Sequence, residues 1–147
     1  MTSTQLAAPR PAVDQIGAML ADARERTLLL IAPLDQHDLA TQHDLLMSPI
    51  LWDLGHIAHF EELWLTRNLD GPVEFVEMPG LYNPFEHPRR ERGALPLPDL
   101  AQCLARMTEI RGRVLDRLAR FAPDDEDTLR RDGYVYAIVA QHEYQHD

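Results

Sequence analysis

The sequence contains one cysteine, few basic residues and no long apolar stretch. The single Cys103 excludes an internal disulfide framework and a cysteine-rich zinc site. Fourteen Lys and Arg residues stand against 24 Asp and Glu, and the resulting net charge of −10 disfavours binding to a nucleic-acid backbone. No apolar run approaches the ~20 residues that cross a bilayer, and the first ten residues lack the layout of a signal peptide. We therefore expect a cytoplasmic protein that binds neither nucleic acid nor membrane.

The size and composition are those of one globular domain spanning residues 1–147. The hydrophobic fraction is 45% and the charged fraction is 26%, which gives enough apolar material for a core. The chain has no internal repeat and no low-complexity tract.

Helical periodicity dominates the sequence, and no segment has the alternation of a strand. Apolar residues recur at steps of three and four in four segments, which are 13–34, 48–68, 99–121 and 128–147. Ser48 is expected to cap the second helix ahead of Pro49, and Asp99 is expected to cap the third. The pattern predicts an all-α, antiparallel four-helix bundle.

The segment 70–98 between the second and third helices has no periodicity. Six prolines forbid a long helix there: Pro72, Pro79, Pro84, Pro88, Pro96 and Pro98. A connection of about 29 residues inside a compact domain is usually functional or disordered. Its aromatic and charged content, which includes Phe75 and Tyr82, favours an ordered, functional loop.

The fourth helix ends in a histidine pair with the spacing of a metal site. His142 and His146 are four residues apart, so both imidazoles lie on one helix face. This face continues the apolar stripe of Val135 and Ile138, which predicts that the pair points into the bundle. Such pairs are more often surface residues or satisfied core residues, so the spacing alone leaves both interpretations open.

The second helix supplies a further candidate, His56, beside its apolar face. One histidine from this helix and two from the fourth would form a three-imidazole site with open positions, suited to iron(II), zinc or nickel. His59 is rotated away and is expected to be half-exposed rather than a ligand. Glu61 lies in the apolar stripe, and both it and Asp147 are either acids that orient a ligand imidazole or acids of a helix surface.

The residues His142 to His146 also fit the H-E-x-x-H pattern of zinc peptidases, in which Glu143 would be the general base. The chain shows no mixture of strand and helix signals around this pattern. The peptidase hypothesis therefore ranks third among the functions considered.

Arg89 and Arg92 lie in a basic cluster of the long loop. Arginine is a planar fork that binds carboxylates, so the pair is a candidate anion site. A solvated charge run that pairs with Glu86 and Glu91 explains the same spacing slightly better.

Four segments together resemble one family, the N-terminal DinB-like domain of the hercynine oxygenases. These are iron(II)-dependent sulfoxide synthases of ergothioneine biosynthesis, and the resemblance covers nearly the whole chain. The segments are Leu46–Ile57 (LMSPILWDLGHI), Glu61–Leu65 (EELWL), Leu81–Arg89 (LYNPFEHPR) and Gln141–Asp147 (QHEYQHD). The resemblance implies a DinB-like four-helix bundle.

The resemblance also assigns roles to individual residues. It implies that His56, His142 and His146 bind Fe(2+), that Arg89 and Arg92 hold carboxylates of the thiol substrate, and that Gln145 lies near the hercynine pocket. The family joins hercynine to γ-glutamylcysteine or cysteine with O₂ and forms a sulfoxide.

Family members continue into a second, C-terminal domain that resembles the formylglycine-generating enzyme and supplies much of the pocket. This domain is missing from the sequence, so we expect a fragment or a truncated gene product whose site the missing domain would complete. Two hypotheses follow: the chain is the iron-binding half of an oxygenase, or it is a stand-alone DinB-like bundle that binds a divalent metal without oxygenase activity.

Overall fold

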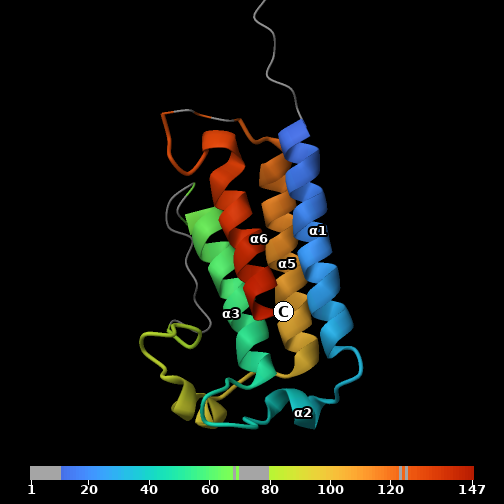
Figure 1. Ribbon diagram of the computed structural model, residues 1–147, viewed down its shortest axis with the longest axis vertical. Helices are drawn as coiled ribbons and strands as arrows, with labels where there is room; N and C mark the ends of the chain where they lie inside the picture. The colour runs from blue at the N-terminus through green and yellow to red at the C-terminus, as the bar shows by residue number, and fades with distance from the viewer. Residues whose placement is uncertain (1–10, 68, 70–79, 123, 125) are drawn as a thin grey trace, which may run out of the picture.

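The protein is a bundle of helices. The computed structural model describes residues 11–67, 69, 80–122, 124 and 126–147. Four long helices lie side by side (Figure 1), and the described residues contain no strand. The elements are α1 (Pro11–Ile31), α2 (Gln36–Ala40), α3 (Ile50–Glu62), the π-helical turn η1 (Leu63–Arg67), the 3₁₀ turn η2 (Arg89–Ala94), α5 (Leu100–Ala119), the 3₁₀ turn η3 (Arg131–Gly133) and α6 (Tyr134–His146). The predicted all-α four-helix architecture is confirmed.

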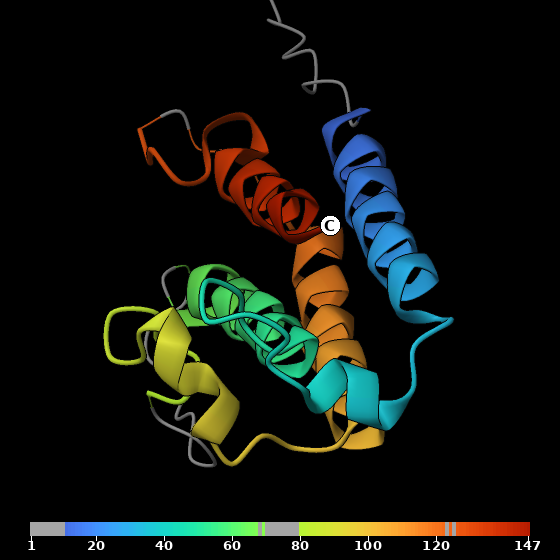
Figure 2. The same ribbon diagram turned by 60° about the horizontal axis from the view of Figure 1, so that its bottom comes forward.

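The helices form two pairs of opposite direction. α1 packs mainly against α6 and α3 mainly against α5. The colours in Figure 1 show that the members of each pair run the same way, whereas the two pairs are antiparallel to each other. The long connection after α3 therefore returns the chain to the end where α3 began. That end also holds the last turn of α6 and α2 (Figure 2).

The core comes from the apolar stripes that the periodicity predicted. Fully buried side chains from all four helices include Leu20, Leu54, Met107 and Val139. Two residues at apolar helical positions lie outside the core, where their spacing predicts burial: Leu28 is 41% exposed and Tyr134 is 53% exposed.

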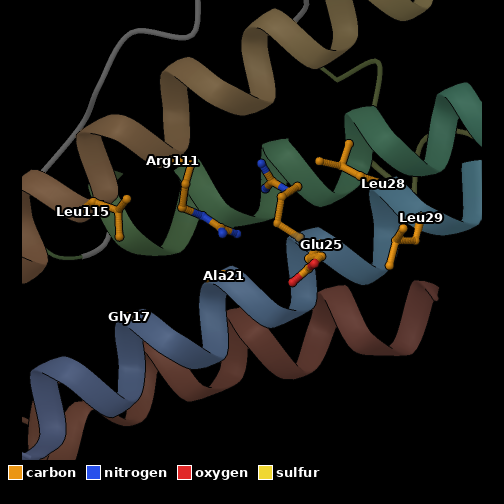
Figure 3. Close-up of a pocket in the computed structure, with 8 residues that line it drawn as sticks. Gly17, Ala21, Glu25, Leu28, Leu29, Arg111 and Leu115 are labelled. Carbon is orange, nitrogen blue, oxygen red and sulfur yellow. The ribbon is translucent and has the colours of Figure 1, made fainter. Parts of the chain in front are cut away.

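Leu28 instead lines a groove of about 460 Å³ between α1 and α5, together with Leu29 and Leu115 (Figure 3). Leu28 follows the buried Thr27 by one residue, a rotation of about 100° that turns its side chain out of the core. The candidate histidines do not line this groove.

Two predicted helix boundaries are wrong. The first helix ends at Ile31 rather than near residue 34, and the last begins at Tyr134 rather than near residue 128. The late start of α6 follows from the backbone, since Asp132 (φ 52°) and Gly133 (φ 73°) are in the left-handed region, which a right-handed helix cannot include. The second predicted helix is α-helical to Glu62, π-helical over Leu63–Arg67 and helical again at Leu69, so its expected end near residue 68 agrees with the described residues, although Asn68 itself is outside them.

Of the two predicted helix caps, one is confirmed and the other is wrong. Asp99 caps α5 in a capping box with Gln102. Ser48 does not cap α3, which begins after Pro49 without a side-chain cap. The Ser48 hydroxyl instead accepts a hydrogen bond of 2.8 Å from Arg92 of the loop, so its oxygen binds the loop rather than the backbone N–H groups at the start of α3. A short helix that the periodicity did not predict, α2, has its own capping box between Asp35 and Asp38.

The described part of the long loop, residues 80–98, consists of turns and η2, in agreement with its prolines. It packs on α3 through a small apolar cluster of Trp52, Leu81 and Tyr82. The Trp52 indole N–H donates to the carbonyl of Leu81 at 3.0 Å. The expectation of an ordered loop is confirmed for this part, whereas residues 70–79, including Phe75, are outside the described residues.

None of the helices that the structure describes combines the length and the apolar character needed to cross a bilayer.

Candidate metal centre

Three histidines from two helices converge near one end of the bundle. His56 comes from the middle of α3, whereas His142 and His146 lie on consecutive turns of α6. One ring nitrogen from each lies within 4.8 Å of the other two. The Nε2 atoms of His56 and His142 are 3.1 Å apart. The structure thus brings together the three residues that the sequence predicted as a metal site.

The loop fixes the orientation of His56. Its Nδ1 atom donates to the backbone carbonyl of Tyr82 at 2.9 Å, and because a carbonyl only accepts, Nδ1 carries the proton. The neutral ring then has a free lone pair on Nε2, the atom that faces the other histidines. The Trp52 ring stacks on the same imidazole with centroids 4.9 Å apart.

Burial keeps two of the imidazoles neutral. Desolvation, aided by the other histidines, lowers the pKa of His56 to about 4 and the pKa of His142 to about 3. The His142 ring also stacks on Phe60, with centroids 3.8 Å apart and planes within 9°. At neutral pH both rings therefore offer lone pairs rather than positive charges.

His146 is the most exposed member, with 25% of its side chain accessible at the end of α6. Its Nδ1 atom lies 3.6 Å from Oδ1 of Asp53, which is on α3. Burial raises the pKa of the Asp53 carboxyl, against the opposing effect of His146 and Arg92. The prediction that the whole pair points into the bundle therefore holds fully only for His142.

The donor set fits a divalent transition metal. With metal–nitrogen bonds of ~2.0–2.1 Å, two cis ligands lie about 3.0–3.4 Å apart, and the separation of 3.1 Å between His56 and His142 falls in that range. Three neutral imidazoles without a thiolate suit iron(II), zinc or nickel. Three protein ligands leave positions for substrate, as catalytic metal sites do.

A cleft of about 700 Å³ opens beside the histidines. His56 and His146 form part of its wall, and η2 with the turn before it forms another part. All three further residues that the sequence predicted for substrate binding line this cleft: Arg89, Arg92 and Gln145. Arg89 and Gln145 are exposed, so both side chains are open to a ligand.

Arg92 is held rigidly and is not part of a solvated charge run. Only 5% of the residue is exposed, and its guanidinium lies 3.7 Å from the centre of the Trp52 ring. Its Nε donates to the carbonyl of His87 and its Nη1 donates to Ser48, both at 2.8 Å. Of the acids proposed as partners, Glu91 pairs with Arg90 instead, at 3.4 Å.

Glu61 does not orient an imidazole and is not a surface acid, so both sequence interpretations of it are wrong. It is 1% exposed and belongs to a buried tetrad with Arg24, Arg111 and Glu143. Arg111 binds Glu61 at 2.6 and 3.2 Å and binds Glu143 at 2.9 Å. Arg24 binds Glu143 at 2.7 Å and Glu61 at 3.0 Å, so each arginine bridges both acids.

The tetrad weighs against the peptidase hypothesis. Glu143 is 1% exposed, and besides the two arginines its carboxylate has the Thr27 hydroxyl 3.0 Å away. A general base must reach a water molecule at the metal, whereas this carboxylate is fully occupied in the core. The same Thr27 hydroxyl, whose one proton serves a single acceptor at a time, lies closer to Asp147, at 2.7 Å, and this contact rather than an imidazole holds Asp147. His59 is half-buried near Tyr82 and is not among the converging histidines, as expected.

Sequence reasoning missed three features of the site: Asp53, the carbonyl of Tyr82 and the two arginines of the tetrad. Asp53 precedes His56 by three residues, so helical spacing alone could have placed it beside the site. The carbonyl of Tyr82 could not be predicted, because every residue has a backbone carbonyl whatever its side chain.

Comparison with known proteins gives one family and several relatives. The family model described as the DinB superfamily matches residues 19–147. A hercynine oxygenase of Mycobacterium tuberculosis is 42% identical over 137 residues, 91% of this chain and 31% of the relative. Relatives of the same name are 42% identical in Mycolicibacterium thermoresistibile, over 98% of this chain and 31% of the relative, and 43% identical in Mycolicibacterium smegmatis, over 87% and 29%. The chain thus spans less than a third of the length of these curated relatives.

Proposed function

The chain belongs to the DinB superfamily, and from this membership and its relatives we propose that it is the iron(II)-binding part of a hercynine oxygenase. The reaction would join hercynine to a thiol, γ-glutamylcysteine or cysteine, with O₂ to form a sulfoxide. Relatives named hercynine oxygenase at 42–43% identity support the reaction class. The observation that carries the proposal is the convergence of three histidine nitrogens beside a cleft with two arginines.

In this proposal His56, His142 and His146 hold Fe(2+). The iron would supply the electron transfer to O₂ and the acidification of the thiol that the reaction needs. Two of the rings are kept neutral by burial, and the carbonyl of Tyr82 fixes the tautomer of His56, so the chain presents lone pairs without first releasing protons.

The arginines would bind and orient the thiol substrate. Arg92 is fixed by Ser48, the carbonyl of His87 and the Trp52 ring, so a carboxylate that binds its remaining N–H groups is placed at a defined distance from the histidines. Arg89, exposed on the same wall, would complete the grip on that carboxylate. Gln145, one residue from His146, would donate to or accept from hercynine.

A further domain, which the relatives' greater length leaves room for, would complete the pocket in this proposal. A cytoplasmic location, where hercynine and small thiols would both be available, remains a prediction.

Anaerobic titration with Fe(II), followed by calorimetry, tests the metal site. We expect one iron per wild-type chain, no binding by His142→Ala, and nearly unchanged binding by His59→Ala, because His59 is outside the convergent set. Equal loss in both variants would contradict the ligand assignment.

Turnover is tested separately by supplying the iron-loaded chain with hercynine, γ-glutamylcysteine and O₂, alone and joined to the remaining length of a relative. Sulfoxide formed only by the joined protein supports the oxygenase proposal. Iron binding without turnover in either form would favour the stand-alone metal-binding bundle.

A further inference from the structure

One carboxylate faces the metal histidines from the cleft side. Asp53 lies on α3 one turn before His56, and 30% of its side chain is exposed. Its Oδ1 atom is 3.6 Å from Nδ1 of His146. With Asp53 beside Nδ1, Nε2 is the ring nitrogen of His146 that is left to bind a metal.

Asp53 is itself held from its other side. The Ser48 hydroxyl and the positive charges of Arg92 and Arg89 all act to lower the pKa of its carboxyl, against the effect of burial. Ser48 in turn accepts from Arg92 at 2.8 Å. The contacts form a continuous line from Arg92 through Ser48 and Asp53 to His146.

His146 has more need of such support than the other two histidines. The His56 ring is fixed by the Tyr82 carbonyl and by Trp52, and the His142 ring is fixed against Phe60. For His146, the most exposed of the three, the carboxylate of Asp53 at 3.6 Å is the corresponding contact. An exposed ring keeps one orientation only when a side-chain contact selects it.

We propose that Asp53 is a positioning residue for the metal centre, which holds His146 with its proton on Nδ1 and ties this histidine to the arginine loop through Ser48 and Arg92. This inference rests on the proposed function, because it presupposes that the three histidines bind a metal. A carboxylate behind a ligand imidazole fixes the tautomer, raises the basicity of the ligand nitrogen and typically contributes 10–100-fold to metal affinity. An ordinary exposed ion pair would contribute almost nothing.

Cobalt(II) is a suitable probe, since its visible spectrum reports the number and kind of its ligands. We expect Asp53→Ala to weaken Co(II) binding by about 10–100-fold and to change the visible spectrum as the His146 donor is lost or reoriented. Asp53→Glu, which keeps a carboxylate, should recover most of the affinity and the wild-type spectrum. Asp14→Ala removes the same charge from the first turn of α1 and should bind like the wild type.

Histidine ring spectra of the zinc-loaded chain give a readout that a merely structural role would leave unchanged. In the wild type His146 should show a single tautomer with the proton on Nδ1, and in Asp53→Ala it should lose the downfield Nδ1 proton signal. Urea unfolding of the metal-free variants verifies that each is folded. If Asp53→Ala does not fold, Ser48→Ala cuts the same line of contacts on its other side and should weaken Co(II) binding by a smaller factor.

The outcomes separate the two proposals. A wild-type chain that does not bind Co(II) overturns the proposed metal site and this inference with it. A wild-type chain that binds, together with a folded Asp53→Ala variant of equal affinity, spectrum and His146 tautomer, overturns the role of Asp53 alone.

Discussion

Replacing Arg111 with methionine should unbalance the charges at the centre of the bundle. Methionine keeps most of the side-chain volume but removes a positive charge that is 8% exposed. Glu61 loses its bidentate partner, Glu143 loses one of its two arginines, and the carbonyl of Leu20 loses a donor at 2.6 Å. Arg24 then remains as one positive charge between two buried carboxylates.

Breaking a buried ion pair by removing one partner costs about 3–5 kcal/mol. Here the lower half of this range applies, because Arg24 still reaches both acids. Protonation of one carboxylate would also restore the charge balance of the tetrad. For a carboxyl group that has an ordinary pKa of ~4.3 in the unfolded chain, this protonation costs about 3.7 kcal/mol at pH 7. We therefore expect a loss of about 3–4 kcal/mol from the free energy of unfolding at pH 7.

Urea unfolding of the metal-free chain, followed by circular dichroism, measures this loss as a shift of the midpoint. With an m-value of ~1–3 kcal/mol/M, the midpoint should fall by roughly 2 M. The relief by protonation costs only about 1 kcal/mol at pH 5, so the difference between variant and wild type should shrink at that pH. Arg26→Met is the matched control, since it breaks only the exposed pair with Asp22 and should leave the midpoint nearly unchanged.

A loss below about 1 kcal/mol at pH 7, or a loss that is independent of pH, would refute this account of the tetrad. A second test adds Glu61→Gln to Arg111→Met, which leaves Arg24 and Glu143 as a balanced pair. The double variant should be more stable than the sum of the two single losses predicts, by at least about 1 kcal/mol. Simple additivity would contradict the charge-balance argument.

Three further expectations concern the site and the core. The metal-free chain should lose stability as the pH falls below 6.5. The reason is that histidines of the unfolded chain take up protons at a pKa of 6.5, whereas His56 and His142 in the folded chain do so only near 4 and 3. A urea midpoint that does not change between pH 7 and pH 5 would exclude this. The Cys103 thiol, 3% exposed and with its pKa raised to about 11 by burial, should resist a disulfide reagent at about pH 8 until the chain is unfolded. Gly55→Ala should weaken Co(II) binding, because the added Cβ would lie 2.1 Å from ring atoms of Tyr82 and would displace the residue that holds His56. Gly112→Ala, whose Cβ would have nothing within 4 Å, should raise the free energy of unfolding by about 0.5–1 kcal/mol and leave metal binding unchanged.

The repeating features of the bundle could be predicted from the sequence. Apolar residues at steps of three and four located the long helices, and the spacing of His142 and His146 put both on one face of the last. The cap at Asp99 could be predicted from its own side chain, and the capping box that it forms with Gln102 is local as well. Each of these features depends on residues within one or two turns of each other.

The features that could not be predicted depend on contacts between distant segments. Ser48 has the chemistry of a helix cap, but its oxygen is bound by Arg92, 44 residues away. Glu61 was recognised as unusual in an apolar stripe, but the arginines that neutralise it come from two other helices. The late start of α6 was missed because the left-handed backbone at Asp132 and Gly133 breaks a periodicity that continues on either side.

The tetrad takes one residue from each long helix: Arg24 from α1, Glu61 from α3, Arg111 from α5 and Glu143 from α6. Any assembly of only three of these helices therefore buries a net charge. The buried charge is positive when α3 or α6 is absent and negative when α1 or α5 is absent. Partly folded intermediates that have already excluded water carry this penalty, whereas the complete bundle is neutral. We expect the chain to fold in a single all-or-none step, in which the three candidate ligand histidines come together only when the last helix docks.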